Sequence, residues 1–201
     1  MKELEVTLCD HSDKAPTPSK VGAKEMEVLA LWQATKIDEP AGRYTMGRYG
    51  VMSVFIQGKW MPVPSLPDFE GILADGHQFI FDVKVCSQAS YALSGGTSKS
   101  FKHQYKHMQR RAKFGAICFL LMHFNARKMT TKVDPAFTVM LPIYDSHPLW
   151  EAYERGEQKS ITRQEAELYG IPVAWRTPKK KVLPALYEGI KQLEQLLTEE
   201  E

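Results

Sequence analysis

The sequence predicts an α/β fold in which a central mixed β-sheet is flanked by helices. The first observation is that strand-like runs occur together with segments whose apolar residues have helical spacing. The strand-like runs are 51–60, 68–85 and 136–144, and the helical segments are 21–36, 99–113, 147–156, 160–170 and 181–197. The second observation is size: 201 residues, 43% of them hydrophobic, are enough to bury one core.

We therefore expect one domain, residues 21–201, preceded by a flexible N-terminal arm of residues 1–20 with Pro16 and Pro18 in a polar setting. No apolar run approaches the ~20 residues that span a bilayer, and the acidic N-terminus lacks the apolar core of a signal peptide. The three cysteines are widely spaced and form no CxxC motif, which argues against a disulfide framework or a structural zinc site. These features favour a cytoplasmic protein without a membrane partner.

Charge is distributed unevenly along the chain. Residues 83–133 contain ten Lys or Arg and no Asp or Glu, whereas the rest of the chain has 16 basic and 24 acidic residues. A surface that serves only solubility normally mixes both signs. The segregation indicates a polyanionic partner, of which nucleic acid is the commonest, and a solvated basic face is the alternative.

Local patterns predict further features of the helices. The segment 21–36 has an apolar stripe that we expect to face the core, with Glu27 toward solvent, and residues 38–50 are rich in turn formers. Thr162 and Glu165 form a capping-box pattern. The apolar stripe of segment 181–197 is either core or a partner surface. The first stripe comprises Val21, Glu25, Val28, Leu29 and Trp32, and the last comprises Leu186, Ile190, Leu193 and Leu197.

The Asp75-Gly76 pair between two strand-like runs predicts a hairpin. A two-residue loop would leave Asp68 and Asp82 on opposite faces. A three-residue loop, 74–76, with Gly76 in the left-handed region, places Asp68 directly across from Asp82 and Leu73 across from His77. One face is then core and the other is charged. The core face comprises Phe69, Leu73, Phe79, Phe81, Val83 and Val85, and the charged face Asp68, Glu70, Asp82 and Lys84.

Adjacent carboxylates raise each other's pKa unless a cation lies between them, so this register suggests a divalent metal. Hard oxygen ligands favour Mg²⁺, with Mn²⁺ as a substitute. Such an ion can polarise a phosphodiester and hold the attacking water, which Lys84 on the same face can orient or deprotonate. The alternative is that Asp68 caps a turn after Pro67 and that Asp82 and Lys84 are solvent-facing strand residues.

Pro67-Asp68 followed by Asp82-Val83-Lys84 resembles the PD-(D/E)xK nuclease core. More particularly, the chain is similar to the RecU family of Holliday junction resolvases. Three family elements occur in order: Asp68 to Gly71, Asp82 to Lys84, and His103-Gln104 with His107-Met108 on a helix before an apolar strand. The likeness resumes at residues 156–170. The family usually has Glu at the position of Asp82 and a long basic stalk where residues 38–66 form a shorter segment, so a divergent, phage-type member is expected.

The resemblance implies a restriction-endonuclease-like core and a role for each site residue. The implied catalytic residues are Asp68, Asp82, Lys84 and Gln104, and the implied metal ligands are Asp68, Asp82, Val83 and Glu25. Nucleases of this superfamily often add a Glu from the first helix, and Glu25 is the acid on the expected inward stripe, with Glu27 and Glu70 as alternatives.

The helical segment 99–113 is expected to pack by one stripe and to offer its flanks to DNA phosphates. The packing stripe is Phe101, Tyr105, Met108 and Ala112. The expected DNA-binding residues are Lys99, Lys102, His103, Lys106, His107, Arg110, Arg111 and Lys113.

Together these patterns predict a single nuclease domain, a magnesium-dependent endonuclease that resolves four-way junctions or other branched DNA in recombination. A junction presents two equivalent strands, so a homodimer with two-fold symmetry is expected. One alternative is a nuclease of the same fold that acts on linear duplex DNA. The other is a DNA-binding protein of this fold that no longer cuts.

Overall fold

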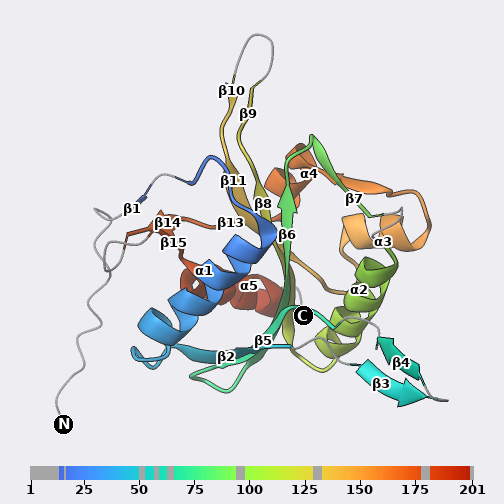
Figure 1. The fold of residues 1–201 in the computed structure, drawn as a ribbon, viewed down its shortest axis with the longest axis horizontal. Helices are drawn as coiled ribbons and strands as arrows, with labels where there is room; N and C mark the ends of the chain where they lie inside the picture. The colour runs from blue at the N-terminus through green and yellow to red at the C-terminus, as the bar shows by residue number, and fades with distance from the viewer. Residues whose placement is uncertain are drawn as a thin grey trace.

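The computed structural model describes residues 14–15, 17–49, 53–56, 59–62, 66–93, 98–128, 133–177 and 182–199. They form three layers, with helices on both faces of a six-stranded sheet (Figure 1). The strand order is β13-β11-β8-β6-β5-β2, in which β6 and β8 are parallel and the other neighbours antiparallel. The predicted mixed sheet flanked by helices is thus confirmed.

The sheet strands are β2 (Tyr44–Arg48), β5 (Phe69–Leu73), β6 (Gln78–Cys86), β8 (Ile117–Phe124), β11 (Phe137–Pro142) and β13 (Ile171–Pro172). The helices are α1 (Ala23–Gln33), continued by the π-helix η2 (Ala34–Asp38), α2 (Ser98–Ala112), α3 (Pro148–Glu154), α4 (Arg163–Tyr169) and α5 (Leu186–Glu199). One small sheet contains the short strands β1 (Lys14–Ala15), β14 (Trp175–Arg176) and β15 (Leu183–Pro184). Three further sheets have two strands each: β3 (Ser53–Ile56) with β4 (Lys59–Pro62), β7 (Ser90–Ala92) with β12 (Ser160–Thr162), and β9 (Arg127–Lys128) with β10 (Val133–Asp134).

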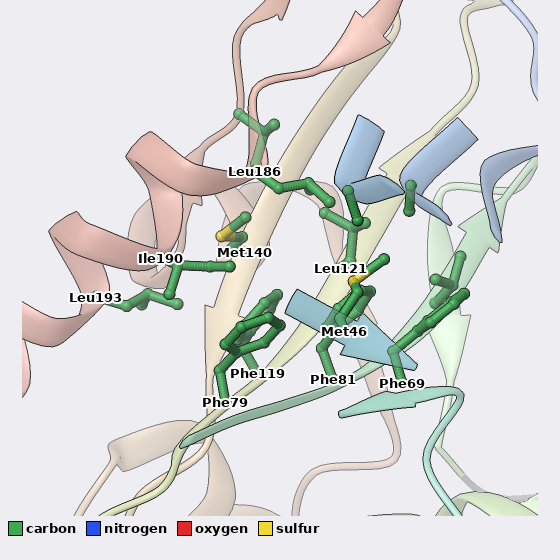
Figure 2. Packing of buried hydrophobic residues seen from close by; sticks show 14 of the residues in the cluster. Met46, Phe69, Phe79, Phe81, Phe119, Leu121, Met140, Leu186, Ile190 and Leu193 are labelled. Atoms are coloured by element: carbon green, nitrogen blue, oxygen red, sulfur yellow. The ribbon is translucent and has the colours of Figure 1, made fainter. Parts of the chain in front are cut away.

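One face of the sheet packs against α1 and α5. Its centre is a row of stacked rings from three adjacent strands, in which the centroids of Phe69 and Phe81 are 4.9 Å apart and those of Phe81 and Phe119 are 5.0 Å apart. Figure 2 shows Ile190 and Leu193 of α5 on the same side as these rings. The stripe of α5 is therefore core at Leu186, Ile190 and Leu193, all fully buried.

The other face packs against α2, α3 and α4. The predicted stripe of α2 is buried at Phe101, Tyr105 and Met108, whose rings and sulfur lie in a second core with Trp150 of α3. α4 begins at the predicted capping box, in which the Thr162 hydroxyl accepts a hydrogen bond from the Glu165 amide. Both predictions from the sequence are confirmed.

The hairpin of β5 and β6 has the predicted three-residue loop. Phe69 pairs with Phe81 and Ile72 with Gln78, and the Leu73 amide donates to the His77 carbonyl at 2.9 Å. Gly76 has a φ of 94°, a conformation that side chains disfavour. Gly71 is also required, because a Cβ there would lie 2.3 Å from the ring of Phe79.

Three expectations are corrected. The phase of α1 is wrong: Val28 is 62% exposed and Glu25 is exposed, whereas Met26, Ala30 and Glu27 are buried. Apolar residues lie all around this helix, so the contacts with the sheet decide which side is buried. Residues 44–48, expected to be turn, form edge strand β2.

The expectation of a flexible arm over residues 1–20 is also wrong in part. Lys14–Ala15 form β1, which pairs with β14, and the Ser19 carbonyl accepts from the Ala126 amide at 2.7 Å. Residues 1–13 and 16 of the expected arm lie outside the described residues.

Two histidines are buried in their neutral form. His123 of β8 lies with Nδ1 2.7 Å from the Thr138 hydroxyl, and His147 caps α3 by accepting from the Leu149 amide at 3.2 Å. Burial lowers the pKa of each to about 4, from an ordinary 6.5. Since the unfolded histidines titrate near 6.5, each stabilises the fold above pH 6.5, and this contribution is lost as the pH falls toward 4.

We predict that the free energy of unfolding decreases by about 2 kcal/mol per histidine between pH 7 and pH 5. Urea unfolding followed by circular dichroism at both pH values measures the change. His147→Asn keeps an N-cap acceptor without a titrating ring and should lose about 2 kcal/mol less than the parent chain, a difference in which the opposite contribution of buried Asp82 cancels. The exposed His103→Gln is the control and should lose as much as the parent chain; an equal loss in His147→Asn and the parent would contradict the prediction.

Candidate active site

The site is built where β5 begins and β6 continues beyond it, paired with β8 on its other edge. The register that pairs Phe69 with Phe81 places Asp68 across from Asp82. Asp68 Oδ2 accepts a hydrogen bond from the Val83 amide at 2.8 Å, so this side chain occupies the edge of β6 that β5 no longer covers. The predicted pairing of the two aspartates is therefore what the backbone shows.

Asp82 is fully buried. The pKa of Asp82 is raised to about 7, mainly because the carboxyl is buried; the Lys84 ammonium opposes this rise and the Asp68 carboxylate adds to it. Neither carboxylate oxygen makes a hydrogen bond of regular geometry with a described residue. A buried carboxylate with unused acceptor capacity is costly unless a cation is close to it.

Lys84 is the cation that the chain itself supplies. Its Nζ forms an ion pair with Asp82 and donates to Gln104 Oε1 at 3.0 Å. Burial alone would lower the pKa of Lys84, but Asp82, with Tyr91 and Asp68, raises it above its ordinary value. The lysine is therefore held protonated against the carboxylate.

Gln104 brings α2 into the site. Its side chain is buried, accepts from Lys84 and donates from Nε2 to the Leu66 carbonyl at 3.3 Å. The amide thus fixes Lys84 from one side and holds the segment just before Pro67-Asp68 from the other. The structure brings together Asp68, Asp82, Lys84 and Gln104, and their catalytic role stays a prediction.

The residues present fit a divalent cation. Two carboxylates from adjacent strands converge, and the buried oxygens of Asp82 lack regular hydrogen bonds within the described part of the chain. An all-oxygen donor set of this kind suits Mg²⁺, which keeps several waters and takes one or two carboxylates. Asp68 and Asp82 would hold the ion, with the backbone carbonyl of Val83 between Asp82 and Lys84.

The acid that α1 directs at the site is Glu27 and not Glu25. Glu25 is exposed, and its carboxylate accepts from the Gly22 amide at the start of the helix. Glu27 is buried and forms an ion pair with Arg48 of β2. Burial and the Asp68 carboxylate raise the pKa of Glu27, so the charges of these two acids interact.

Glu70 has a different environment. Tyr49 donates to its carboxylate, and burial together with Glu70 raises the pKa of Tyr49 to about 12, so the phenol keeps its proton. The ring of Tyr49 lies edge-on to His107 of α2, with centroids 6.5 Å apart. Tyr49 and Glu70 also line a groove of about 410 Å³, together with Gly47, Arg48 and Ile72.

The predicted DNA-binding residues of α2 separate into two groups. The half-buried His107 and Arg111 face the sheet, where Arg111 donates to Gln78 and burial lowers the pKa of His107. The others with described side chains are exposed: Lys102, His103, Lys106, Arg110 and Lys113. Nothing is described of the side chain of Lys99, and residues 94–97 lie outside the described chain.

Sequence reasoning missed Glu27 as the inward acid, its partner Arg48, and Tyr49. The signal for Glu27 was present, since it is spaced three residues before Ala30 and seven before Ala34, both fully buried. No comparable signal marked Arg48 or Tyr49, because both follow Gly47 in a segment rich in turn formers.

A second group of potential metal ligands lies at the tip of the hairpin. One ligand atom each of Asp75, His77 and Glu194 lies within 4.8 Å of the others. Lys191 Nζ pairs with both carboxylates, at 2.8 Å from Asp75. The Lys191 ammonium is therefore the cation that balances the carboxylates of Asp75 and Glu194.

No helix among the described segments has the length and apolar character needed to cross a bilayer.

The chain is 30% identical over 112 residues to the Holliday junction resolvase RecU of Geobacillus sp. (strain WCH70), which is 55% of this chain and 49% of that protein. It is 30% identical over 76 residues to the Holliday junction resolvase RecU of Geobacillus kaustophilus (strain HTA426), which is 37% of this chain and 34% of that protein. The aligned regions thus span half the length of these relatives or less.

Among solved structures, the chain is similar to Archaeoglobus fulgidus Hjc, a Holliday junction resolvase from an archaeal hyperthermophile, with a TM-score of 0.40 and 18% identity over 67% of this chain and 86% of that one. The model of the family RecU, Recombination protein U, matches residues 33–184. This match includes both strands of the hairpin and all of α2. The chain therefore belongs to the RecU (Recombination protein U) family.

Proposed function

We propose that this protein is a metal-dependent endonuclease that hydrolyses DNA phosphodiesters and resolves four-way junctions or other branched DNA in recombination. The observation that carries the proposal is the convergence of Asp68 and Asp82 across one hairpin, with Lys84 held against them by Gln104. The Holliday junction resolvases named among its relatives support the choice of a junction as substrate.

Each residue has a part in the proposed reaction. Asp68 and Asp82 would hold Mg²⁺ or Mn²⁺, with Val83 by its carbonyl and Glu27 from α1. When bound, the ion supplies Lewis acidity toward the phosphate and its water. Lys84, kept in place by Gln104, orients the attacking water or balances charge that develops on the phosphate.

Exposed cations support DNA as the substrate. Lys102, Lys106 and Arg110 stand outward on α2, whose opposite side contacts Lys84 through Gln104. A backbone bound along this row would lie across the width of α2, about 10 Å, from the acidic site. Phosphate contacts of this kind supply affinity without sequence information.

Cutting both strands of a junction in concert requires two sites, and we propose a two-fold symmetric homodimer. Sedimentation at micromolar concentration, with and without DNA, tests this assembly. A monomer under both conditions would favour the linear-duplex nuclease considered above.

The test of function compares a labelled four-way junction with a linear duplex, each with and without Mg²⁺. We predict cleavage of the junction that requires the metal and is abolished by EDTA. Asp82→Asn should reduce the rate roughly a hundredfold or more while leaving DNA affinity nearly unchanged, since affinity comes from the basic residues. Cleavage of linear duplex alone would indicate the alternative substrate.

The matched control is Glu151→Gln, an equivalent loss of one carboxylate at an exposed position on α3. It should cleave at the parental rate. Lys84→Ala should also abolish cleavage, but it leaves Asp82 without its partner and should lower stability as well. Full activity of Asp82→Asn would overturn the site assignment.

A second prediction concerns the helix acid. Glu27→Gln should lower the cleavage rate and raise the Mg²⁺ concentration needed for half-maximal activity, because the charges of Glu27 and Asp68 interact. Glu25→Gln, two residues away and exposed, is the control and should change neither quantity. The reverse result would restore the first assignment of Glu25 and show that α1 is turned the other way in the active protein.

A further inference from the structure

We propose that α2 carries a second DNA subsite, in which Phe114 stacks on an unpaired nucleobase of the strand whose phosphates bind Lys102, Lys106 and Arg110. This inference rests on the proposed function and extends it, since it names DNA with unpaired bases as a preferred substrate. The argument starts from the spacing of four residues.

Lys102, Lys106, Arg110 and Phe114 follow one another at intervals of four. Each interval is one turn, about 6 Å along the helix axis. Such a row runs obliquely over the surface of a helix, here from one flank of α2 across its outer side. The three cations are exposed, and Phe114 is 90% exposed at the end of the row.

The end of α2 presents Phe114 outward. The Phe114 amide donates to the Arg111 carbonyl at 3.0 Å, and the Gly115 amide donates to the Ala112 carbonyl at 2.9 Å. Gly115 then takes a φ of 83°, which ends the helix and turns the chain into β8. The Phe114 ring therefore lies at the last turn of the helix and is exposed to solvent, whereas the apolar stripe of α2 packs against the sheet.

The cations of the row have no acidic partner among the residues whose side chains are described. Arg110 donates only to the carbonyl of Lys106 in that set, whereas the neighbouring Lys113 pairs with Asp145 at 3.2 Å. An acid-free row of cations complements a phosphate backbone. An aromatic ring beside such a row is the arrangement that binds single strands, because every base has a face on which a ring can stack.

Exposure alone would not carry this inference, since single apolar side chains are common on surfaces. Leu168 on α4 is 73% exposed as well, but it follows Glu167 and stands in no row of cations. It is therefore the matched control for Phe114.

The subsite is within reach of the proposed active site. Gln104, which contacts Lys84, precedes Phe114 by ten residues, or about 15 Å along the helix axis. At about 3.4 Å per nucleotide, that is roughly four nucleotides of one strand. An unpaired base some four nucleotides from the cleaved bond would reach the ring.

The experiment measures affinity without metal, so that no DNA is cut. The full chain binds a duplex with a five-nucleotide single-stranded gap and a fully paired duplex of equal length. Phe114→Ala should weaken binding to the gapped DNA about 5- to 150-fold and binding to the paired duplex less than about twofold. Its slope of log affinity against log salt should be unchanged, because no charge is removed.

Three further variants complete the design. Phe114→Trp should keep affinity, and its fluorescence should be quenched by gapped DNA. Leu168→Ala should behave as the parent chain. The combined Lys102→Ala, Lys106→Ala and Arg110→Ala variant should weaken both DNAs and flatten the salt slope by up to about 3.

The inference is overturned if Phe114→Ala weakens both DNAs equally or neither. It is also overturned if that variant dissociates an oligomer in sedimentation while gapped DNA binds as before, because a second copy of the chain would then cover the ring. Failure of the proposed function is a separate result: the parent chain would cleave no DNA with Mg²⁺.

Discussion

The register of one hairpin is the constraint on which the rest of this protein depends. Side chains alternate across a strand, so a slip of one residue between β5 and β6 would exchange the two faces of the hairpin. Gly76 permits the three-residue loop, and Gly71 leaves room for the ring of Phe79. The same pairing that stacks Phe69 on Phe81 therefore also brings Asp68 opposite Asp82.

The buried acid then links the two sides of the molecule. Asp82 takes its counterion from Lys84, and Lys84 takes its second partner from Gln104 on α2. That contact can form only where the apolar stripe of α2 has packed against the sheet. Folding of the second core and assembly of the candidate site are thus one event, which keeps the lysine within a few ångströms of the paired carboxylates.

Sequence reasoning succeeded where patterns among nearby residues were clear. The buried side of α2 and the capping box of α4 follow from a few neighbouring residues, and of the two loop lengths considered for the hairpin, the three-residue loop that keeps the charged residues on one face is the one observed. It failed at α1, where Val28 and Met26 offer two apolar sides of similar quality, so that only contacts with the sheet select Glu27 over Glu25. It also missed β2, because Gly47 and Arg48 give little strand signal. The strand forms through antiparallel pairing with β5, which a local pattern does not reveal. The central residues Asp68, Asp82, Lys84 and Gln104 could be predicted from the sequence, whereas the surrounding Glu27, Arg48 and Tyr49 could not.

The ion pair of Asp82 and Lys84 also constrains how this chain can evolve. A lineage released from selection for cleavage could not discard either residue alone, since the survivor would remain as an uncompensated charge in the interior. Neutral drift would have to pass through a destabilised ancestor or replace both positions together by apolar residues. Non-cleaving descendants should therefore either replace both residues together or retain both for stability.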